Sequence, residues 1–255
     1  MKGIQRLAGV GLIGVVGLLL GGMQLVGGCT AEKVNPRLAA TTAPTTRVFG
    51  KEAPDPLRFE KEIVKFEQAD AANMPAKGAA LFVGSSSIRG WKLGESFPEY
   101  VTINRGFGGS SASDVVHYVP RIVWPYKAGV VVFYAGENDI SAGRSAEEVL
   151  GSVKEFVRLV REKQAGVKIV LVGIKPSPLR WDHRLEFRRA NRLVEKWARG
   201  QRGLVFVDVE PAMLDEDGVV RGELFKSDRL HMNEKGYELW KGLLAQELSG
   251  AAKNR

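Results

Sequence analysis

Five short apolar runs, each followed by a polar or helical stretch, dominate the chain between residues 80 and 209. They cover residues 80–83, 100–103, 130–135, 168–174 and 204–209. Each run is long enough for one buried strand, and the segments between the runs leave room for helices. This alternation predicts a parallel sheet that is covered by helices on both faces, which is an α/β fold.

Apolar residues at helical spacing mark the segments around these runs. The clearest case is 145–163, where valines and a phenylalanine recur every three or four residues. The same criterion predicts further helices, at 57–71, 111–119, 184–199 and 233–248. The helix at 184–199 is rich in arginine, which we interpret as a solvated face, with a patch for anionic partners as the alternative.

The N-terminal segment differs from the rest of the chain. Lys2 and Arg6 precede a charge-free apolar run from residue 7 to residue 28, and the run ends at Cys29, the only cysteine. Such a run predicts an export signal or a membrane anchor over residues 1–29. The sequence before Cys29 resembles a bacterial lipobox, which implies a lipid-modified cysteine and a lipoprotein tethered in the cell envelope.

Two other outcomes remain open for this segment. The apolar run is long enough to cross a bilayer uncut, and the signal could also be cleaved to release a soluble form. Residues 30–56 are rich in Thr, Ala, Pro and Lys and predict a flexible linker. The folded domain is therefore expected to occupy residues 57–255.

Composition and charge exclude several classes of function. The chain has 255 residues, of which 44% are apolar and 26% charged, as in ordinary globular proteins. Its net charge of +8 comes from scattered Lys and Arg that are not interleaved with aromatics, so no nucleic-acid partner is expected. No histidine or cysteine cluster has metal-ligand spacing, and the glycine-rich stretch 106–111 fits neither nucleotide-binding motif. We therefore predict no metal and no cofactor.

The candidate chemistry begins where the first apolar run ends. This run breaks at Gly84 into Ser85, Ser86 and Ser87, followed by a plausible helix start. A strand, turn and helix of this kind can expose a serine hydroxyl at the mouth of a parallel sheet. Because ligands bind at the carboxyl ends of parallel strands, polar residues after the other runs are expected nearby.

A serine nucleophile needs a base, and the chain offers three histidines. His117 falls on an apolar helix and His183 in a polar loop, and both are interpreted as structural. His231 follows Asp228 by three residues, which lets the carboxylate hold one ring nitrogen and leave the other free as the base.

Stabilisation of an oxyanion requires hydrogen-bond donors near the serine. Gly109 lies after the second run and can present its backbone N–H, whereas Asn138, after the third run, can add a side-chain amide. The alternative for Asn138 is a turn-forming role alone.

Taken together, these blocks resemble the SGNH hydrolases, also called the GDSL esterase and lipase family, over about residues 79–248. The resemblance is to the branch typified by platelet-activating-factor acetylhydrolase catalytic subunits. It implies a flavodoxin-like three-layer fold with five parallel strands. It also implies the following roles: nucleophile Ser86, base His231, orienting acid Asp228, and an oxyanion hole formed by Ser86, Gly109 and Asn138.

One position departs from the family pattern. The usual Gly-Asp-Ser reads Gly-Ser-Ser here, with Ser85 in place of the aspartate. The triple serine also leaves Ser85 and Ser87 as alternatives to Ser86.

These residues predict an exported serine esterase that hydrolyses short acyl esters, acetyl esters foremost, including esters of carbohydrate. Arg180 and Trp181, in the loop after the fourth run, are candidate substrate contacts, with an ordered loop as the alternative. A lysophospholipase or lipase, and a non-catalytic carbohydrate- or lipid-binding module, are the alternative functions. The expected partners are the acyl ester and the membrane.

Overall fold

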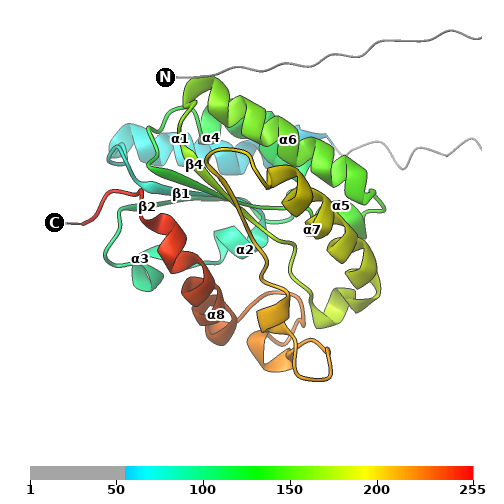
Figure 1. The fold of residues 1–255 in the computed structure, drawn as a ribbon. Helices are drawn as coiled ribbons and strands as arrows, with labels where there is room; N and C mark the ends of the chain where they lie inside the picture. Colours follow the sequence, from blue (N-terminus) through cyan, green and yellow to red (C-terminus); the bar gives the residue numbers. More distant parts are fainter. Residues whose placement is uncertain (1–54, 255) are drawn as a thin grey trace, which may run out of the picture. The chain divides into compact units, whose positions relative to one another are not determined.

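The computed structural model describes residues 55–254, which form a five-stranded parallel sheet between two layers of helices (Figure 1). The strands, in chain order, are β1 Ala80–Gly84, β2 Thr102–Gly106, β3 Val130–Tyr134, β4 Lys168–Val172 and β5 Leu204–Val207. Their order across the sheet is β2-β1-β3-β4-β5. The predicted parallel α/β fold is confirmed, and the strand order reverses between β1 and β3, where such folds bind ligands.

The helices that surround the sheet vary widely in length. The α-helices are α1 Glu60–Ala72, α2 Ser86–Arg89, α3 Leu93–Ser96, α4 Ala112–Ile122, α5 Glu137–Ser141, α6 Ala146–Lys163, α7 Arg184–Ala198 and α8 Glu234–Leu244. The 3-10 helices are η1 Pro56–Phe59, η2 Pro178–His183, η3 Pro211–Met213, η4 Gly222–Leu224 and η5 Ala245–Leu248. Capping boxes at Ser111 and Ser145 fix the starts of α4 and α6, because each serine exchanges hydrogen bonds with the residue three positions on.

Both faces of the sheet are buried, so its central strands are apolar throughout. All residues of β1 and β3 are buried, as expected for parallel strands with helices on each side. Leu81 and Val83 pack in a cluster with residues of α1, α4, α6 and α7. Phe82 points to the other face and packs with Trp240 of α8 and the segment around α3.

The described chain begins with η1, which lies against the loop after β2. Arg58 pairs with Asp114 at the start of α4 at 2.6 Å. The Phe59 ring meets Phe107 edge-on, with 5.0 Å between the ring centroids. Because Phe107 immediately precedes Gly108 and Gly109, η1 supports the loop that carries the predicted oxyanion glycine.

The position of β2 differs from the prediction. The sequence places a strand at 100–103, but β2 spans Thr102–Gly106 and includes the polar residues Asn104 and Arg105 at its carboxyl end. Arg105 forms a buried ion pair with Asp70, and the Asn104 amide donates to the carbonyl of Ile88 at 2.7 Å. These contacts satisfy polar side chains that a hydrophobicity pattern assigns to a loop.

Several helix boundaries are also refined. The predicted helix at 57–71 is divided between η1 and α1, and the one at 233–248 between α8 and η5. The four- or five-residue helices α2, α3 and α5 are too short to show periodicity. No helix within residues 55–254 is long and apolar enough to cross a membrane. Residues 1–54, with the predicted export segment, most of the linker and Cys29, lie outside the described residues.

We expect Gly84→Ala to lower the free energy of unfolding by about 3 kcal/mol. Gly84 has a φ of +150°, and a Cβ there would lie 1.9 Å from the Tyr134 carbonyl oxygen. The matched control is Gly151→Ala in the interior of α6, where nothing outside the backbone of the helix itself lies within 4 Å of the added carbon. This control should gain about 0.5–1 kcal/mol. Urea unfolding of both variants measures the difference, and equal stabilities would contradict the close approach of β1 and β3.

Candidate active site

Ser86 lies at the start of α2, immediately beyond the carboxyl end of β1. The turn is fixed by a hydrogen bond from the Ser85 N–H to the Tyr134 carbonyl at 3.1 Å. Ser85 and Ser87 are buried, with 3% and 2% of their surface exposed, whereas Ser86 is half-buried. Of the three consecutive hydroxyls, that of Ser86 is therefore the most accessible.

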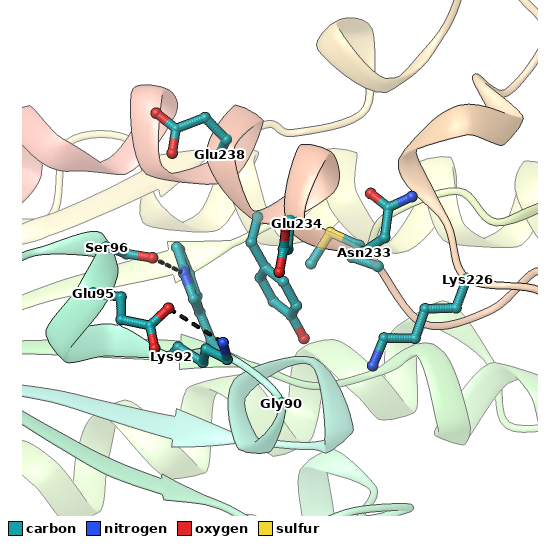
Figure 2. A pocket seen from close by; sticks show the side chains of 11 residues that line it. Gly90, Lys92, Glu95, Ser96, Lys226, Asn233, Glu234 and Glu238 are labelled. Atoms are coloured by element: carbon teal, nitrogen blue, oxygen red, sulfur yellow. Dashed lines mark hydrogen bonds and ion pairs between the residues drawn. The ribbon is translucent and has the colours of Figure 1, made fainter.

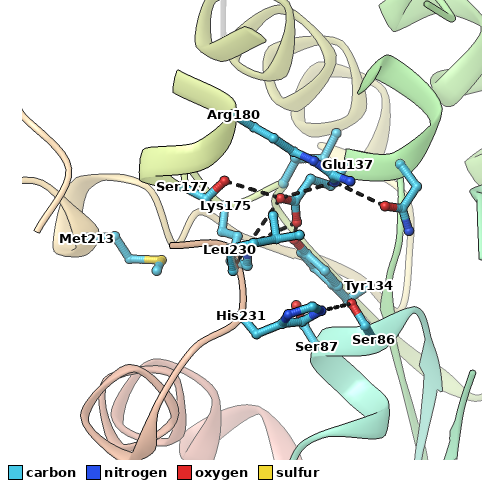
Figure 3. Close-up of polar contacts among 12 residues, drawn as sticks. Ser86, Ser87, Tyr134, Glu137, Lys175, Ser177, Arg180, Met213, Leu230 and His231 are labelled. Carbon is cyan, nitrogen blue, oxygen red and sulfur yellow. Dashed lines mark hydrogen bonds and ion pairs between the residues drawn. The ribbon is translucent and has the colours of Figure 1, made fainter. Parts of the chain in front are cut away.

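His231 and Asp228 meet Ser86 from the loop before α8. The His231 Nε2 lies 3.1 Å from the Ser86 Oγ (Figure 3). The His231 Nδ1 lies 2.7 Å from an Asp228 carboxylate oxygen. The other Asp228 oxygen accepts from the backbone N–H groups of Leu230 and His231, each at 2.9 Å. The structure thus brings together the three residues that the sequence predicts as a triad.

These contacts keep Asp228 ionised. The hydrogen bond from the His231 side chain, and then the two backbone N–H groups, hold the pKa of Asp228 well below its usual value. An ionised Asp228 favours the imidazole tautomer that carries a proton on Nδ1. The Nε2 lone pair then faces the serine hydroxyl, as a general base requires.

The predicted oxyanion donors lie on the loops after β2 and β3. Gly109 has a φ of +82° with open space around its missing Cβ, so the backbone conformation is what requires glycine. Within residues 55–254, no acceptor takes a hydrogen bond from the backbone N–H of Ser86 or of Gly109. Asn138 donates one amide hydrogen to the Ser110 carbonyl at 2.9 Å, which leaves its second hydrogen available.

A buried ionic network lies behind Asn138 and was not predicted from the sequence. Both carboxylate oxygens of Glu137 accept from Lys175, at 3.0 and 3.2 Å, and the Tyr134 hydroxyl donates to one of them at 2.9 Å. The Lys175 ammonium also donates to the Leu230 carbonyl at 2.9 Å. Burial lowers the pKa of Lys175, and Glu137 opposes that effect.

One signal in the sequence could have revealed this network. Glu137 and Lys175 carry opposite charges and each closely follows a buried apolar strand, β3 or β4. Because neighbouring parallel strands end at the same edge of the sheet, such charges are placed to pair.

The other candidate residues have partners of their own. Arg180 in η2 donates to the Asn138 side-chain oxygen at 3.0 Å, and the Arg184 guanidinium lies over the Trp181 ring at 4.8 Å. Substrate contact by Arg180 and Trp181 stays a prediction. His117 packs edge-on against its neighbour Tyr118, and the ring of His183 lies 6.1 Å from that of Phe187, one turn along the chain. Among residues 55–254, no group of three acidic, histidine or cysteine side chains is arranged to hold a metal ion.

A cavity of about 360 Å³ borders the segment that follows α2 and the loop that carries His231 (Figure 2). Its lining includes Gly90, the residue after α2, and Met232 and Asn233, the residues after His231. Five further lining residues are charged: Lys92, Glu95, Lys226, Glu234 and Glu238. The cavity next to the triad loops is therefore lined by charged side chains together with the buried Trp91 and Met232.

Comparison with known proteins identifies related sequences and folds. The model of the GDSL-like Lipase/Acylhydrolase family matches residues 77–239. Platelet-activating factor acetylhydrolase IB subunit alpha1 from Bos taurus is 29% identical over 177 residues, which cover 62% of this chain and 69% of the bovine protein. The human protein of the same name is 28% identical over the same length.

Solved structures share the fold at lower identity. A GDSL-like lipase from Bacteroides thetaiotaomicron superposes with a TM-score of 0.65 at 20% identity, covering 73% of this chain and 97% of the other. A carbohydrate esterase of family 3 from Talaromyces cellulolyticus gives a TM-score of 0.55 at 18% identity, covering 68% and 97%. At these identities the likeness concerns the fold alone.

We expect the Asp228 carboxyl to titrate below the usual range of aspartate, and His231→Ala to raise its pKa by removing its strongest hydrogen bond. Since the folded-state pKa is depressed, the stability that this carboxylate contributes is present above its unfolded pKa. That contribution is lost as the pH falls through the folded pKa. Carbon-13 NMR of the side-chain carboxyls measures both values, with Asp228→Asn to assign the resonance. An unchanged pKa in His231→Ala would contradict the direct contact.

Proposed function

The chain belongs to the GDSL-like lipase/acylhydrolase family and is a carboxylic ester hydrolase, and we propose that it cleaves short acyl esters through an acyl-enzyme on Ser86. The observation that carries this proposal is the continuous hydrogen-bonded series from Asp228 through His231 to Ser86. Its two links measure 2.7 and 3.1 Å, within the range that proton transfer requires.

In the first half of the reaction, the Ser86 oxygen attacks the ester carbonyl carbon while the His231 Nε2 takes the hydroxyl proton. The carbon–oxygen bond to the alcohol then breaks, and His231 gives the proton to the departing oxygen. Water attacks the acyl-enzyme in the second half, again through His231, and the carboxylic acid leaves. Asp228 stays ionised throughout and stabilises the imidazolium that forms at each step.

The charge that develops on the carbonyl oxygen is met by three N–H groups. They belong to the backbone of Ser86 and Gly109 and to the side chain of Asn138. Two of these donors are backbone groups on fixed turns, so little reorganisation is needed as the charge forms. A single side-chain donor of this kind contributes roughly 3 kcal/mol to the barrier reduction.

For the substrate, we propose an acetyl or similarly short acyl group on a polar alcohol such as a carbohydrate. The curated relatives are named acetylhydrolases, which supports a small acyl group. The lining of the cavity that borders the triad loops includes five charged side chains, which supports a polar rather than a long aliphatic partner.

A lipid acyl ester is the second candidate, and the observation that favours it is the charge-free run of residues 7–28, from which a lipid anchor is predicted. A purely binding role is disfavoured, because a ligand-binding module has no need for an imidazole aligned between a carboxylate and a serine hydroxyl.

We expect the wild-type chain to hydrolyse p-nitrophenyl acetate faster than the butyrate and the octanoate, and Ser86→Ala to lose at least 1,000-fold in kcat, roughly the effect of losing a triad member. Ser87→Ala is the matched control, since the Ser87 hydroxyl is buried and it is the Ser86 hydroxyl that lies within hydrogen-bond distance of the His231 Nε2. A wild-type rate equal to that of Ser86→Ala would refute the proposal. Activity that rises with acyl length would favour the lipid substrate instead.

We further propose that residues 1–29 direct export and that Cys29 is lipidated, with residues 30–56 as the linker to the hydrolase. The support is the charge-free run from residue 7 to residue 28 that ends at the only cysteine. All of these residues except Asp55 and Pro56 lie outside the described part of the chain, so the proposal depends on the sequence alone.

Cys29→Ser should abolish incorporation of radiolabelled palmitate in a bacterial host, because the acceptor thiol is gone. Wild-type protein should be labelled and should sediment with membranes. An unlabelled wild-type chain that sediments at full length would indicate an uncleaved anchor. Unlabelled, shortened wild-type protein in the soluble fraction would indicate a cleaved signal.

A further inference from the structure

Arg180 reaches from η2 to the back of the oxyanion residue Asn138. One guanidinium nitrogen, Nη1, lies 3.0 Å from the Asn138 side-chain oxygen and 3.3 Å from a Glu137 carboxylate oxygen (Figure 3). Only 20% of the Arg180 side chain is exposed. Its charged end is engaged by these two contacts, and the contact with Asn138 is made to the amide oxygen.

The two partners of Asn138 allow only one orientation of its amide. The side-chain oxygen accepts from Arg180, while the side-chain nitrogen donates to the Ser110 carbonyl at 2.9 Å. A flipped amide would set its N–H groups against the guanidinium N–H and its oxygen against the Ser110 carbonyl. Both contacts would be repulsive, so the flip is disfavoured. Arg180 also draws electron density toward the amide oxygen, which strengthens the remaining N–H as a donor.

Arg180 is itself held by the buried ionic network. Glu137 accepts from Lys175 and from the hydroxyls of Tyr134 and Ser177, so its carboxylate has a fixed position. Lys175 is only 1% exposed, and its ammonium group also donates a hydrogen bond to the carbonyl of Leu230, the residue before His231. One connected set of contacts thus joins the amide of the oxyanion hole to the loop of the catalytic base.

We propose that Arg180, anchored by Glu137 and Lys175, is a positioning residue that holds the Asn138 amide toward the oxyanion and does not bind substrate. The inference rests on the proposed function, since it assigns Arg180 a part in the same ester hydrolysis. It replaces the sequence-based expectation for Arg180 with a different role, and it leaves Trp181 as a candidate contact.

A double-mutant cycle tests this proposal with p-nitrophenyl acetate. Arg180→Ala should lower kcat by about 10- to 100-fold, the range for losing a charge-assisted hydrogen bond. The KM should change less than about twofold, since no contact with the ground-state substrate is lost. Asn138→Ala should lower kcat by about 100- to 1,000-fold. The double variant should be no slower than Asn138→Ala, because Arg180 acts only through the amide.

Two further variants control the cycle. Arg180→Lys keeps a cation near Glu137 and should recover part of kcat, so it replaces Arg180→Ala if that variant is unfolded by circular dichroism. Arg188→Ala removes an arginine of α7 whose guanidinium pairs with Glu210 at 2.5 Å, and this variant should leave kcat unchanged. Additive effects in the cycle, or a KM that rises with kcat unchanged, would overturn the proposal and make Arg180 a substrate contact.

Failure of the proposed function is recognisable separately. If Ser86→Ala is as active as the wild type, the ester mechanism fails whatever Arg180 does. The positioning role then still has its own readout, which is the nitrogen-15 NMR signal of the Asn138 side-chain amide. Arg180→Ala should shift that signal and broaden or average it, whereas Arg188→Ala should not. An Asn138 signal that is identical in wild type and Arg180→Ala would refute the positioning role.

Discussion

The parallel register of β1 and β3 is the constraint on which the rest of the structure depends. Gly84 lies opposite Tyr134, so the two central strands end together at the point where the strand order reverses. The chain leaves one strand end through Ser86 and the other through Asn138, and the proposed nucleophile and the proposed oxyanion amide follow neighbouring strand ends for that reason. Only glycine permits this approach, because any Cβ at position 84 would overlap the Tyr134 carbonyl.

The buried ion pair near the site contributes more to the orientation of the surrounding loops than to the stability of the fold. Removing Lys175 and Glu137 from water costs several kcal/mol per ion, and their mutual attraction offsets this only when the remaining donors and acceptors are also satisfied. Here those groups are satisfied by Tyr134, Ser177 and the Leu230 carbonyl. An apolar pair of similar volume could stabilise the fold equally well, but it could not hold two loops in a defined orientation.

The parts of the site that the sequence predicts are those with local signals. The alternation of apolar runs gives the sheet, and the turn after Gly84 and the spacing of Asp228 and His231 give the candidate triad. The accessible serine could be chosen by resemblance but not by pattern, since burial of Ser85 and Ser87 depends on tertiary packing. The direction of the Arg180 side chain could not be predicted from the sequence either, because an arginine in a loop can point to solvent or into the protein. Its contacts with Glu137 and Asn138, which come from other parts of the chain, fix the inward direction.

The docking of η1 bears on where the catalytic unit begins. The Asp55 carboxylate caps the backbone of Leu57, and the Pro56 carbonyl accepts from the Tyr118 hydroxyl at 3.0 Å. Together with the contact between Phe59 and Phe107, these bonds make the first described residues part of the support for the oxyanion loop. A shortened protein that starts at α1 would keep every triad residue and still lose the contacts that η1 makes with Phe107 and with α4. The minimal esterase is therefore longer than the sheet, its helices and its triad alone would indicate.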